Sequence, residues 1–328
     1  MKKILQRLFQ QERLDYAEAK QILLNIATEA YNPAHVASFL TVFQMRPIAT
    51  AELQGFRDAL LELCLKIDLS DFNSVDLCGT GGDGKNTFNI STLAAVVTAG
   101  AGYTVTKHGN YGVSSVCGSS NVLEQLGYQF TNDAATLKRQ LEQHQLCFLH
   151  APLFHPAMKA VAPIRRQLGV RTFFNLLGPL VNPIQPKQQM VGVSNLEIVR
   201  LYQYVLQQTN KEFAIVHALD GYDEVSLTGR FKVITPKSEL LLQPKNIGQN
   251  ALIASDLYGG ETIEGAAKIF LTILKGEGTE AQQNVVCTNA GIAIQRFKPE
   301  ANLESCIAEA KEALVSQKAY HNFKALLN

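Results

Sequence analysis

Residues 75–92 read VDLCGTGGDGKNTFNIST, and this stretch determines how the rest of the chain is interpreted. Its first four residues predict a short buried strand, and residues 90–100 predict a helix. Four of the six residues from Gly79 to Gly84 are glycine. Glycine lets backbone amides approach an anion closely, and a helix N-terminus favours negative charge. A plain connecting loop would need fewer glycines, so the stretch predicts an anion-binding loop at the carboxyl end of a strand.

Two well-known anion-binding motifs fit this loop only in part. Gly79, Gly81 and Gly84 match the G-x-G-x-x-G pattern of dinucleotide binding, but five residues separate the last glycine from the helix. The next strand ends in Lys107-His108, where that motif requires an acidic residue. The loop also begins like a P-loop, but Asn86 lacks the hydroxyl that should bind Mg²⁺. We therefore adopt neither motif.

Strand and helix signals alternate after the loop. Residues 225–242 predict hairpins at a sheet edge, and the tail from Glu264 predicts three or four helices. The alternation predicts a mostly parallel sheet with helices on both faces. Besides residues 75–78, we expect its strands at residues 103–107, 146–150, 189–193 and 213–217.

The first part of the chain shows helical patterns with little strand character. Over residues 1–67, Asp15 followed by Glu18 predicts a capping box, and Thr50 is expected to cap a fourth helix. We therefore expect an α/β protein, with a small all-helical domain plus a larger domain that has a mostly parallel central sheet flanked by helices.

These patterns also predict the domain boundaries. The helical domain is expected at residues 1–70, with part of residues 156–185 packing back on it. The α/β domain is then expected at residues 71–155 and 186–328.

Composition excludes several classes of protein. The 328 residues include 30 basic and 29 acidic side chains, giving a formal net charge of +1 without a basic stripe, so we expect no nucleic-acid partner. No run approaches the roughly 18 apolar residues of a membrane span, and no secretory leader is recognised, so we expect no membrane partner. The six cysteines form no C-x-x-C pair and are expected to be reduced thiols of a cytoplasmic protein.

A second loop is predicted to bind anions beside the first. Residues 107–110 read KHGN and follow the second expected strand, so the Lys107 cation is expected at the same sheet edge as the glycine loop. Small and polar residues fill residues 112–120. Two adjacent loops of this kind suit a ligand with phosphate groups at two ends.

Charged residues elsewhere carry weaker signals. Asp223-Glu224 follows the fifth expected strand, where two carboxylates are plausible Mg²⁺ ligands; the alternative is a solvated turn. Arg165 has the geometry to bind a carboxylate through two hydrogen bonds, although a surface arginine is the commoner reading. His155 taken alone is more often structural than functional.

These motifs together with residues 154–156, 165–169 and 175–179 closely resemble the anthranilate phosphoribosyltransferases, and the likeness runs from the helical start to the C-terminal helices. The resemblance implies a helical domain joined by a hinge to an α/β domain, and a homodimer formed through the helical domains. It implies transfer of the phosphoribosyl group of 5-phosphoribosyl 1-pyrophosphate to anthranilate, a step of tryptophan biosynthesis. It also implies that no side chain acts as acid or base and that positioning and Mg²⁺ carry the catalysis.

The resemblance also assigns site residues. The Mg²⁺ ligands are Ser91, Asp223 and Glu224. The anthranilate contacts are Gly79, Asn110 and Arg165, with His108 and His155 as second contacts. Phosphoribosyl pyrophosphate is expected at Gly79, Gly82, Asp83, Thr87, Asn89, Ile90, Ser91, Thr92, Lys107, His108, Gly109, Asn110, Tyr111, Gly112, Val113, Ser114, Ser115 and Ser119.

Three positions depart from the family pattern. Tyr111 stands where the family has arginine, Val116 where lysine is common, and Asn121 where aspartate is common. Two cations beside the phosphates are therefore missing, so that Lys107, backbone amides and Mg²⁺ are expected to balance more of the phosphate charge. A nucleoside phosphorylase of related architecture and a non-catalytic nucleic-acid-binding relative are the alternatives. Asp223-Glu224 and Arg165 disfavour the first, and the balanced charge disfavours the second.

Overall fold

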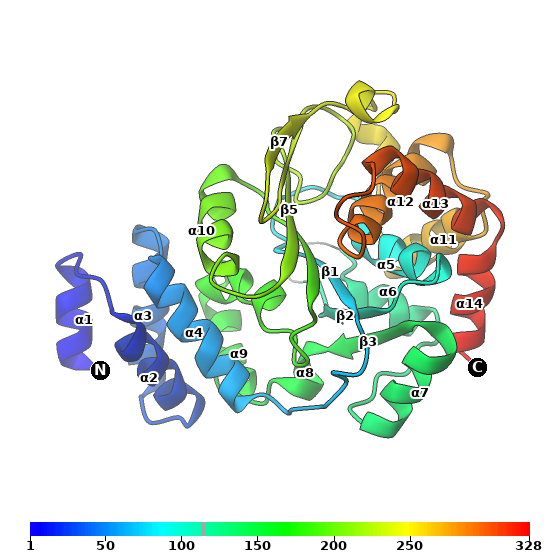
Figure 1. Cartoon of the computed structure of the whole chain (residues 1–328). Helices are drawn as coiled ribbons and strands as arrows, with labels where there is room; N and C mark the ends of the chain where they lie inside the picture. The colour runs from blue at the N-terminus through cyan, green and yellow to red at the C-terminus, as the bar shows by residue number, and fades with distance from the viewer. Residues whose placement is uncertain (113–115) are drawn as a thin grey trace. The chain divides into compact units, whose positions relative to one another are not determined.

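The computed structural model describes residues 1–112 and 116–328 of the chain (Figure 1). These residues form two compact units. The expected fold class, a small all-helical part plus a larger part with a mostly parallel sheet flanked by helices, is confirmed. The helical unit comprises Met1–Ile67 and Ala151–Pro183, and the α/β unit comprises Asp68–His150 and Ile184–Asn328.

Polar side chains cap two helices of the helical unit, at Asp15 and at Asn32. Asp15 accepts the N–H of Glu18 at 2.8 Å, and Glu18 accepts the N–H of Asp15 at 3.2 Å, so the expected capping box is confirmed. The described helices are α1 (Lys2–Phe9), α2 (Tyr16–Ala27), α3 (Pro33–Met45), α4 (Thr50–Leu63), α8 (Ala151–Phe154) and α9 (Met158–Leu168), followed by the 3₁₀ turns η1 (Phe173–Leu176) and η2 (Gly178–Leu180).

The prediction that Thr50 caps α4 is wrong. The helix begins at Thr50, and the Glu52 carboxylate accepts the N–H of Ala49 at 2.8 Å. Glu52 is fully buried and also accepts two hydrogen bonds from the Arg46 guanidinium. The ion pair holds the Glu52 carboxylate where it binds the N–H of Ala49, the residue directly before the helix, and no side chain of the described residues caps the first helical N–H groups.

Phenylalanine side chains join the two sequence segments of the helical unit. Phe173 of η1 stacks on Phe56 of α4 with 4.4 Å between ring centroids. Phe39 and Phe43 of α3 meet the Phe173 ring edge-on. All four side chains are buried, so residues 151–183 pack on the N-terminal helices through this aromatic cluster.

The second segment of the helical unit begins earlier in the chain than expected. Residues 151–155 were expected in the α/β domain, but they group with the helices. The N–H of Leu65 donates to the carbonyl of Phe154 at 2.8 Å, and Nε2 of His155 donates to the carbonyl of Val181 at 2.8 Å. Both hydrogen bonds lie within the helical unit and hold this segment there.

The α/β unit is built on a sheet with the strand order β3-β2-β1-β4-β5-β6-β7 in the described residues. Neighbours from β3 through β5 are parallel, whereas β6 pairs antiparallel with β5 and β7. The expected edge hairpin is confirmed, although residues 225–230 form no strand, and the second strand begins two residues later than expected. The strands are β1 (Val75–Gly79), β2 (Val105–Gly109), β3 (Leu146–His150), β4 (Gln188–Gly192), β5 (Glu212–Ala218), β6 (Phe231–Ile234) and β7 (Glu239–Leu242).

Helices cover both faces of this sheet, as a parallel sheet requires (Figure 1). The C-terminal helices and α5 lie on one side, and α10 lies on the other beside β5. None of the described helices has both the length and the apolarity needed to cross a membrane. The helices are α5 (Ile90–Gly100), α6 (Ser119–Gln125), α7 (Ala134–His144), α10 (Leu196–Leu206), α11 (Ile263–Leu274), α12 (Glu280–Gln295), α13 (Leu303–Val315) and α14 (Lys318–Leu326), with the 3₁₀ turns η3 (Pro244–Ile247) and η4 (Ala254–Leu257).

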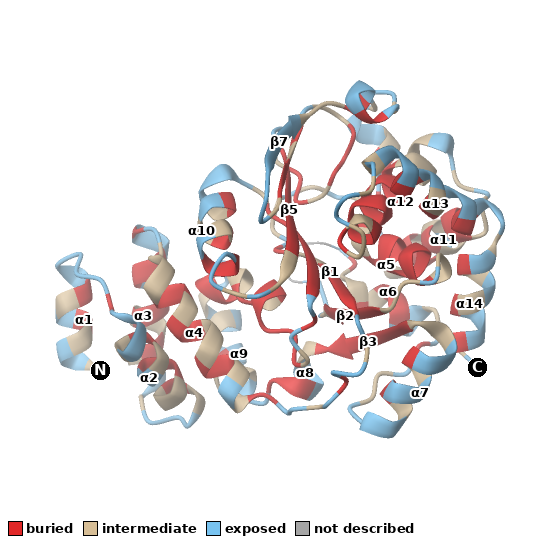
Figure 2. Ribbon diagram, in the orientation of Figure 1, coloured by how far each residue is buried: buried red, intermediate tan, exposed pale blue. Residues whose placement is uncertain are grey.

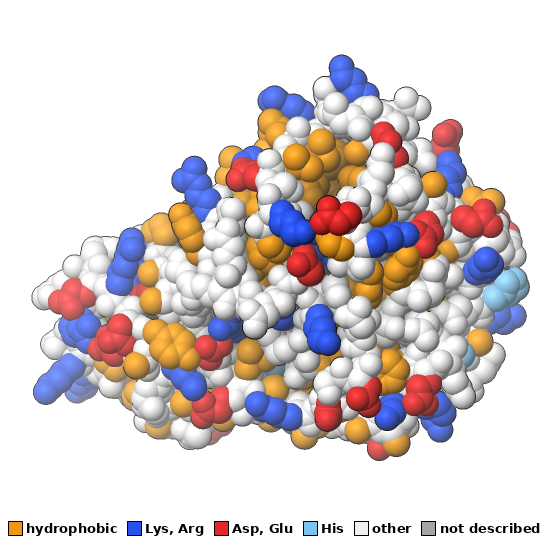
Figure 3. Space-filling view, viewed as in Figure 1, with side chains coloured by type: hydrophobic (Ala, Val, Ile, Leu, Met, Phe, Trp, Pro, Cys, Tyr) orange, Lys and Arg blue, Asp and Glu red, His pale blue; other side chains and the backbone are white. Residues whose placement is uncertain are grey.

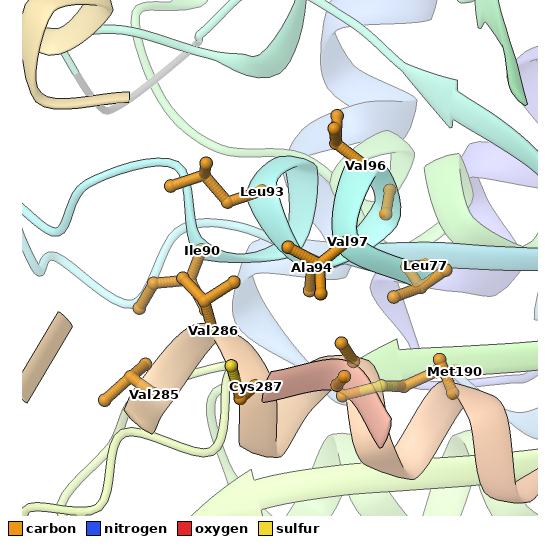
Figure 4. Close-up of a cluster of buried hydrophobic side chains, with 14 of the residues drawn as sticks. Leu77, Ile90, Leu93, Ala94, Val96, Val97, Met190, Val285, Val286 and Cys287 are labelled. Carbon is orange, nitrogen blue, oxygen red and sulfur yellow. The ribbon is translucent and has the colours of Figure 1, made fainter. Parts of the chain in front are cut away.

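The core of the α/β unit forms around α5. Burial is nearly continuous along the parallel strands and α5 (Figure 2). Ala94 and Val97 of α5 lie between Leu77 of β1 and Cys287 of α12 (Figure 4). A helix buried on nearly all sides is held rigidly, so its N-terminus is a fixed point at the carboxyl end of β1.

The aromatic cluster gives a stability prediction. Phe173→Ala should lower the free energy of unfolding by about 3–4 kcal/mol, because it leaves a cavity among three buried rings. Val170→Ala, an exposed position in the same segment, should change it by less than about 0.5 kcal/mol. Urea unfolding followed by circular dichroism measures both, and equal losses in the two variants would contradict the role assigned to the cluster.

Candidate functional site

The sheet reverses its direction of winding between β1 and β4. These strands are adjacent and parallel, with Gly79 paired to Gly192 at their carboxyl ends. Open α/β sheets bind ligands outside the carboxyl ends of strands at such a switch point. The glycine loop begins at this point and leads to α5, which begins at Ile90.

The segment after β5 approaches this switch point closely. A Cβ atom at Gly192 would overlap the backbone carbonyl of Asp223, and one at Gly79 would overlap the Asp223 carboxylate. The N–H of Gly81 donates to Oδ2 of Asp223 at 2.7 Å. Glycine at the ends of both strands is therefore what allows Asp223 to reach the loop.

Two carboxylates meet here in a poorly solvated environment. Burial raises the pKa of Asp223, and the nearby Asp83 charge raises it further. Burial also raises the pKa of Glu224, as does the charge of Asp223; the Lys107 charge and the N–H of Ser91 oppose this rise. The negative charges of two adjacent carboxylates repel each other, so their proximity predicts a site that binds a cation.

Lys107 is buried near Glu224. Its ammonium donates to the carbonyl of Leu77 and, at 3.2 Å, to the hydroxyl of Ser91. Lys107 is 2% exposed, so protein atoms surround it. The structure therefore gives this lysine protein partners, including Ser91 at the start of α5.

The residues present fit Mg²⁺ better than a metal held by protein alone. Among the residues that the structure describes, no three carboxylate, imidazole or thiol side chains gather into a metal-holding group. Mg²⁺ is usually bound by one or two carboxylates plus substrate phosphates and water. Asp223 and Glu224 provide two carboxylates, and Ser91, whose N–H bonds to Glu224, adds a hydroxyl to a donor set of that kind.

The second predicted loop is tied to the first. Nδ2 of Asn89 donates to the carbonyl of Cys117 at 3.0 Å, which links the glycine loop to the segment before α6. The carbonyl of Asn110 accepts the N–H of Ser120 at 3.1 Å and the hydroxyl of Ser119 at 3.2 Å. Both loops therefore lie at the same sheet edge, as expected.

The other residues predicted to contact phosphate differ in their exposure to solvent. Ile90 and Thr92 are buried, and the N–H of Ile90 donates to the carbonyl of Phe88 at 2.6 Å, so a phosphate contact of either residue stays a prediction. Gly82, Asp83 and Thr87 are half-buried in the loop. Val113, Ser114 and Ser115 lie outside the described residues.

Sequence reasoning missed residues 257–260. The N–H of Phe88 donates to the carbonyl of Leu257, and the N–H of Gly259 donates to the carbonyl of Asn86. A Cβ at Gly259 would overlap the Thr87 backbone. The Gly259-Gly260 pair is the only sequence signal for this support of the glycine loop.

Two histidines predicted at the site are buried. His108 lies in β2, and its N–H donates to Oδ1 of Asp76 at 3.0 Å; this buried carboxylate was missed by the sequence analysis. In the helical unit, burial lowers the pKa of His155 to about 4, against hydrogen bonds to the Val181 and Leu60 backbones that raise it. A contact of either ring with anthranilate stays a prediction.

Arg165, in the helical unit, has an N–H donor that its described protein neighbours do not use. Its Nη2 donates to Oδ1 of Asn175 at 3.2 Å, and its guanidinium lies 5.3 Å from the centre of the Phe174 ring. Its buried Nε has no acceptor among the described residues. Burial lowers its pKa. An arginine held on an aromatic face with an unused N–H is suited to a planar carboxylate.

Comparison with known proteins places this geometry in context. Residues 71–320 match the family described as "Glycosyl transferase family, a/b domain", and residues 2–64 match "Glycosyl transferase family, helical bundle domain". A Flavobacterium psychrophilum protein named anthranilate phosphoribosyltransferase is 57% identical over 329 residues, covering 99% of this chain and 98% of the relative.

Solved structures of that name are similar over nearly the whole chain. Anthranilate phosphoribosyltransferase from Thermus thermophilus has a TM-score of 0.91 at 32% identity and covers 98% of both chains. The Saccharomyces cerevisiae protein, solved in complex with PRPP and Mg, has a TM-score of 0.89 at 26% identity, covering 98% of this chain and 95% of that one.

The close approach of Asp223 gives a prediction about metal binding. Gly192→Ala should push the Asp223 backbone away from β4 and weaken divalent-metal binding by about tenfold. Mn²⁺ titration followed by electron paramagnetic resonance measures this. Gly229→Ala, where a Cβ meets only ordinary contacts, is the matched control. Unchanged Mn²⁺ affinity in a folded Gly192→Ala protein would refute the role given to Gly192.

His155 gives a prediction about pH. Its pKa is about 4 when folded, against an ordinary value of 6.5, so the unfolded chain binds the proton first as pH falls. The free energy of unfolding should therefore fall between pH 6.5 and 4, by about 3 kcal/mol from this group. His155→Gln should flatten that part of the curve, whereas His321→Gln, at an exposed position, should not. Urea titrations at each pH measure the slope, and equal slopes in wild type and His155→Gln would contradict the prediction.

Proposed function

The chain belongs to the anthranilate phosphoribosyltransferase family, and we propose that it transfers the phosphoribosyl group of 5-phosphoribosyl 1-pyrophosphate to the amine of anthranilate. The products are N-(5-phosphoribosyl)anthranilate and pyrophosphate, in tryptophan biosynthesis. One observation carries the proposal: at the switch point of the sheet, the buried Asp223 accepts a hydrogen bond from the glycine loop, and the half-buried Glu224 accepts one from the N–H of Ser91 at the start of α5. That arrangement suits a magnesium-bound diphosphate.

We assign Mg²⁺ to Ser91, Asp223 and Glu224. The Glu224 carboxylate is close to the N–H of Ser91, and Asp223 is close enough to raise the pKa of Glu224. These contacts support a shared role of the three residues at the start of α5. Lys107, which contacts the Ser91 hydroxyl, balances part of the Glu224 charge.

The reaction needs charge stabilisation more than proton transfer. The anthranilate amine is neutral and nucleophilic near pH 7, so no side chain need act as a base. Breaking the bond between ribose C1 and pyrophosphate builds negative charge on the leaving group. Bound Mg²⁺ would stabilise that charge. The glycine-loop amides and the N-terminus of α5 add donors fixed in place by the rigid core. Attack from the face opposite the leaving group inverts C1.

Positioning of anthranilate is assigned to Arg165, Asn110 and Gly79. Arg165 is the cation among them, and its unused Nε and aromatic support favour the anthranilate carboxylate. His108 and His155 remain as second contacts in this proposal. Both side chains are buried. The His155 ring donates to the carbonyl of Val181, and His108 is fixed through its backbone N–H, which donates to Asp76; this suits shaping a pocket more than proton transfer.

We also propose a cytoplasmic homodimer. All six cysteines are free thiols, which supports a reducing compartment. Phe9, Tyr16 and Met45 of the helical unit are exposed apolar side chains, with Met45 at 79% exposure, and such side chains support an interface formed through this unit. Light scattering after gel filtration tests the dimer. Side chains of both charge signs mix on the face in Figure 3, in keeping with no nucleic-acid partner.

Loss of anthranilate fluorescence tests the reaction. Purified protein should quench it only when anthranilate, phosphoribosyl pyrophosphate and Mg²⁺ are all present. Omitting each component in turn is the control. No loss from a folded protein would refute the proposal, and phosphate-dependent cleavage of a pyrimidine nucleoside would then identify the phosphorylase alternative.

Arg165 gives a kinetic prediction. Arg165→Ala should raise the KM for anthranilate by about tenfold or more, because a bidentate charge-assisted contact is lost, and should leave the KM for phosphoribosyl pyrophosphate within about twofold. Arg166→Ala, at an exposed neighbouring position, is the matched control. Steady-state kinetics measures both constants, and an unchanged anthranilate KM in Arg165→Ala would rule out this assignment.

A further inference from the structure

We propose that Lys85 is a further substrate-binding residue, whose ammonium is held over the Tyr222 ring at the glycine loop and contacts the pyrophosphate end of the substrate. This inference deepens the proposed function and rests on it. It supplies the cation that the second loop lacks.

The geometry of Lys85 joins the glycine loop to the segment after β5. Its Nζ lies 4.6 Å from the centre of the Tyr222 ring, and its backbone N–H donates to Oδ1 of Asp83 at 2.9 Å. A Cβ added at Gly221 would lie 4.0 Å from its Cε. The side chain therefore runs from the loop across the Gly221-Tyr222 turn, directly before Asp223.

The second loop provides no cation of its own. Between residues 67 and 137, Lys85 and Lys107 are the only lysine or arginine residues in the sequence. Lys107 is 2% exposed and is engaged with Leu77 and Ser91. Lys85 is half-buried at the loop surface, so it is the cation of this stretch that a ligand can reach.

The Tyr111 side chain has protein partners and does not supply the positive charge of the missing arginine. Its hydroxyl donates to Oε1 of Glu124 at 2.7 Å, and its ring meets the His150 ring edge-on at 4.8 Å. These contacts engage the side chain with α6 and β3. Val116 is 48% exposed and apolar, so it provides no charge either.

Lys85 is a cation in acidic surroundings. The Tyr222 ring is 4% exposed, and an ammonium over such a ring is partly dehydrated and restricted in direction. Asp220 and Asp223 lie on either side of Gly221-Tyr222 in the sequence, and Asp83 accepts the N–H of Lys85 within the glycine loop. The surroundings of the Lys85 ammonium are therefore acidic. A diphosphate entering with Mg²⁺ would be repelled by those carboxylates, and a lysine held among them offsets part of that repulsion.

Three variants test whether the positive charge at position 85 binds the substrate. Lys85→Met should raise the KM for phosphoribosyl pyrophosphate by about tenfold, with kcat and the anthranilate KM within about twofold. Lys85→Arg should recover most of the loss, because it keeps the cation. Lys245→Met removes an exposed lysine from the same unit and should leave both KM values unchanged.

A double-mutant cycle tests the role of the ring. Tyr222→Leu should raise the same KM by a smaller factor, and it should add little in the Lys85→Met background, because the ring acts through the ammonium. Fully additive effects would show that Tyr222 does not act through Lys85 and would overturn that part of the proposal.

Calorimetric titration with magnesium pyrophosphate keeps this inference separate from the proposed function, because binding needs no turnover. Weaker binding by Lys85→Met than by wild type supports the inference even if no transfer reaction is found. Wild-type pyrophosphate affinity in a folded Lys85→Met protein overturns it. An equal rise in the KM of both substrates would also overturn it, since that would indicate a structural role.

Discussion

The close approach of Asp223 to the carboxyl ends of β1 and β4 is the constraint on which the site depends. Gly79 and Gly192 are paired across the sheet, and a side chain at either position would displace the Asp223 backbone or carboxylate. With both Cβ atoms absent, Oδ2 of Asp223 reaches the N–H of Gly81, although 142 residues separate them. The glycine loop, the acidic pair and the start of α5 are brought together by that approach.

This arrangement concentrates charges that oppose one another. Asp223 and Glu224 have raised pKa values because burial removes water and each carboxylate lies near another acid. Lys107 offsets part of the carboxylate charge. Repulsion of this kind destabilises the site without a ligand, and a divalent cation with a polyanionic substrate relieves it. The local charge is therefore arranged for a magnesium-bound diphosphate, although the whole chain is nearly neutral.

The helical unit contributes through packing that brings two sequence segments together. The Phe173 ring inserts among the rings of Phe39, Phe43 and Phe56, so the segment that follows β3 becomes part of the helical core. Arg165 is carried on that segment and lies against Phe174. Because residues 151–183 interrupt the α/β unit in the sequence and pack in the helical unit, each unit holds its own polar groups on a packed core: Arg165 in the helical unit and Asp223 in the α/β unit.

Local signals in the sequence determined most of the elements, because helix caps, buried strands and glycine loops depend on neighbouring residues. The capping box at Asp15, the helix over residues 90–100 and the strand over residues 146–150 follow from such signals. Tertiary structure alone decided that Gly192 makes room for Asp223, that residues 257–260 support the glycine loop, and that Lys85 lies over Tyr222. These contacts join positions far apart in the chain, and a local pattern such as Gly259-Gly260 does not name its partner, since the physical cause is how closely the two segments approach after folding.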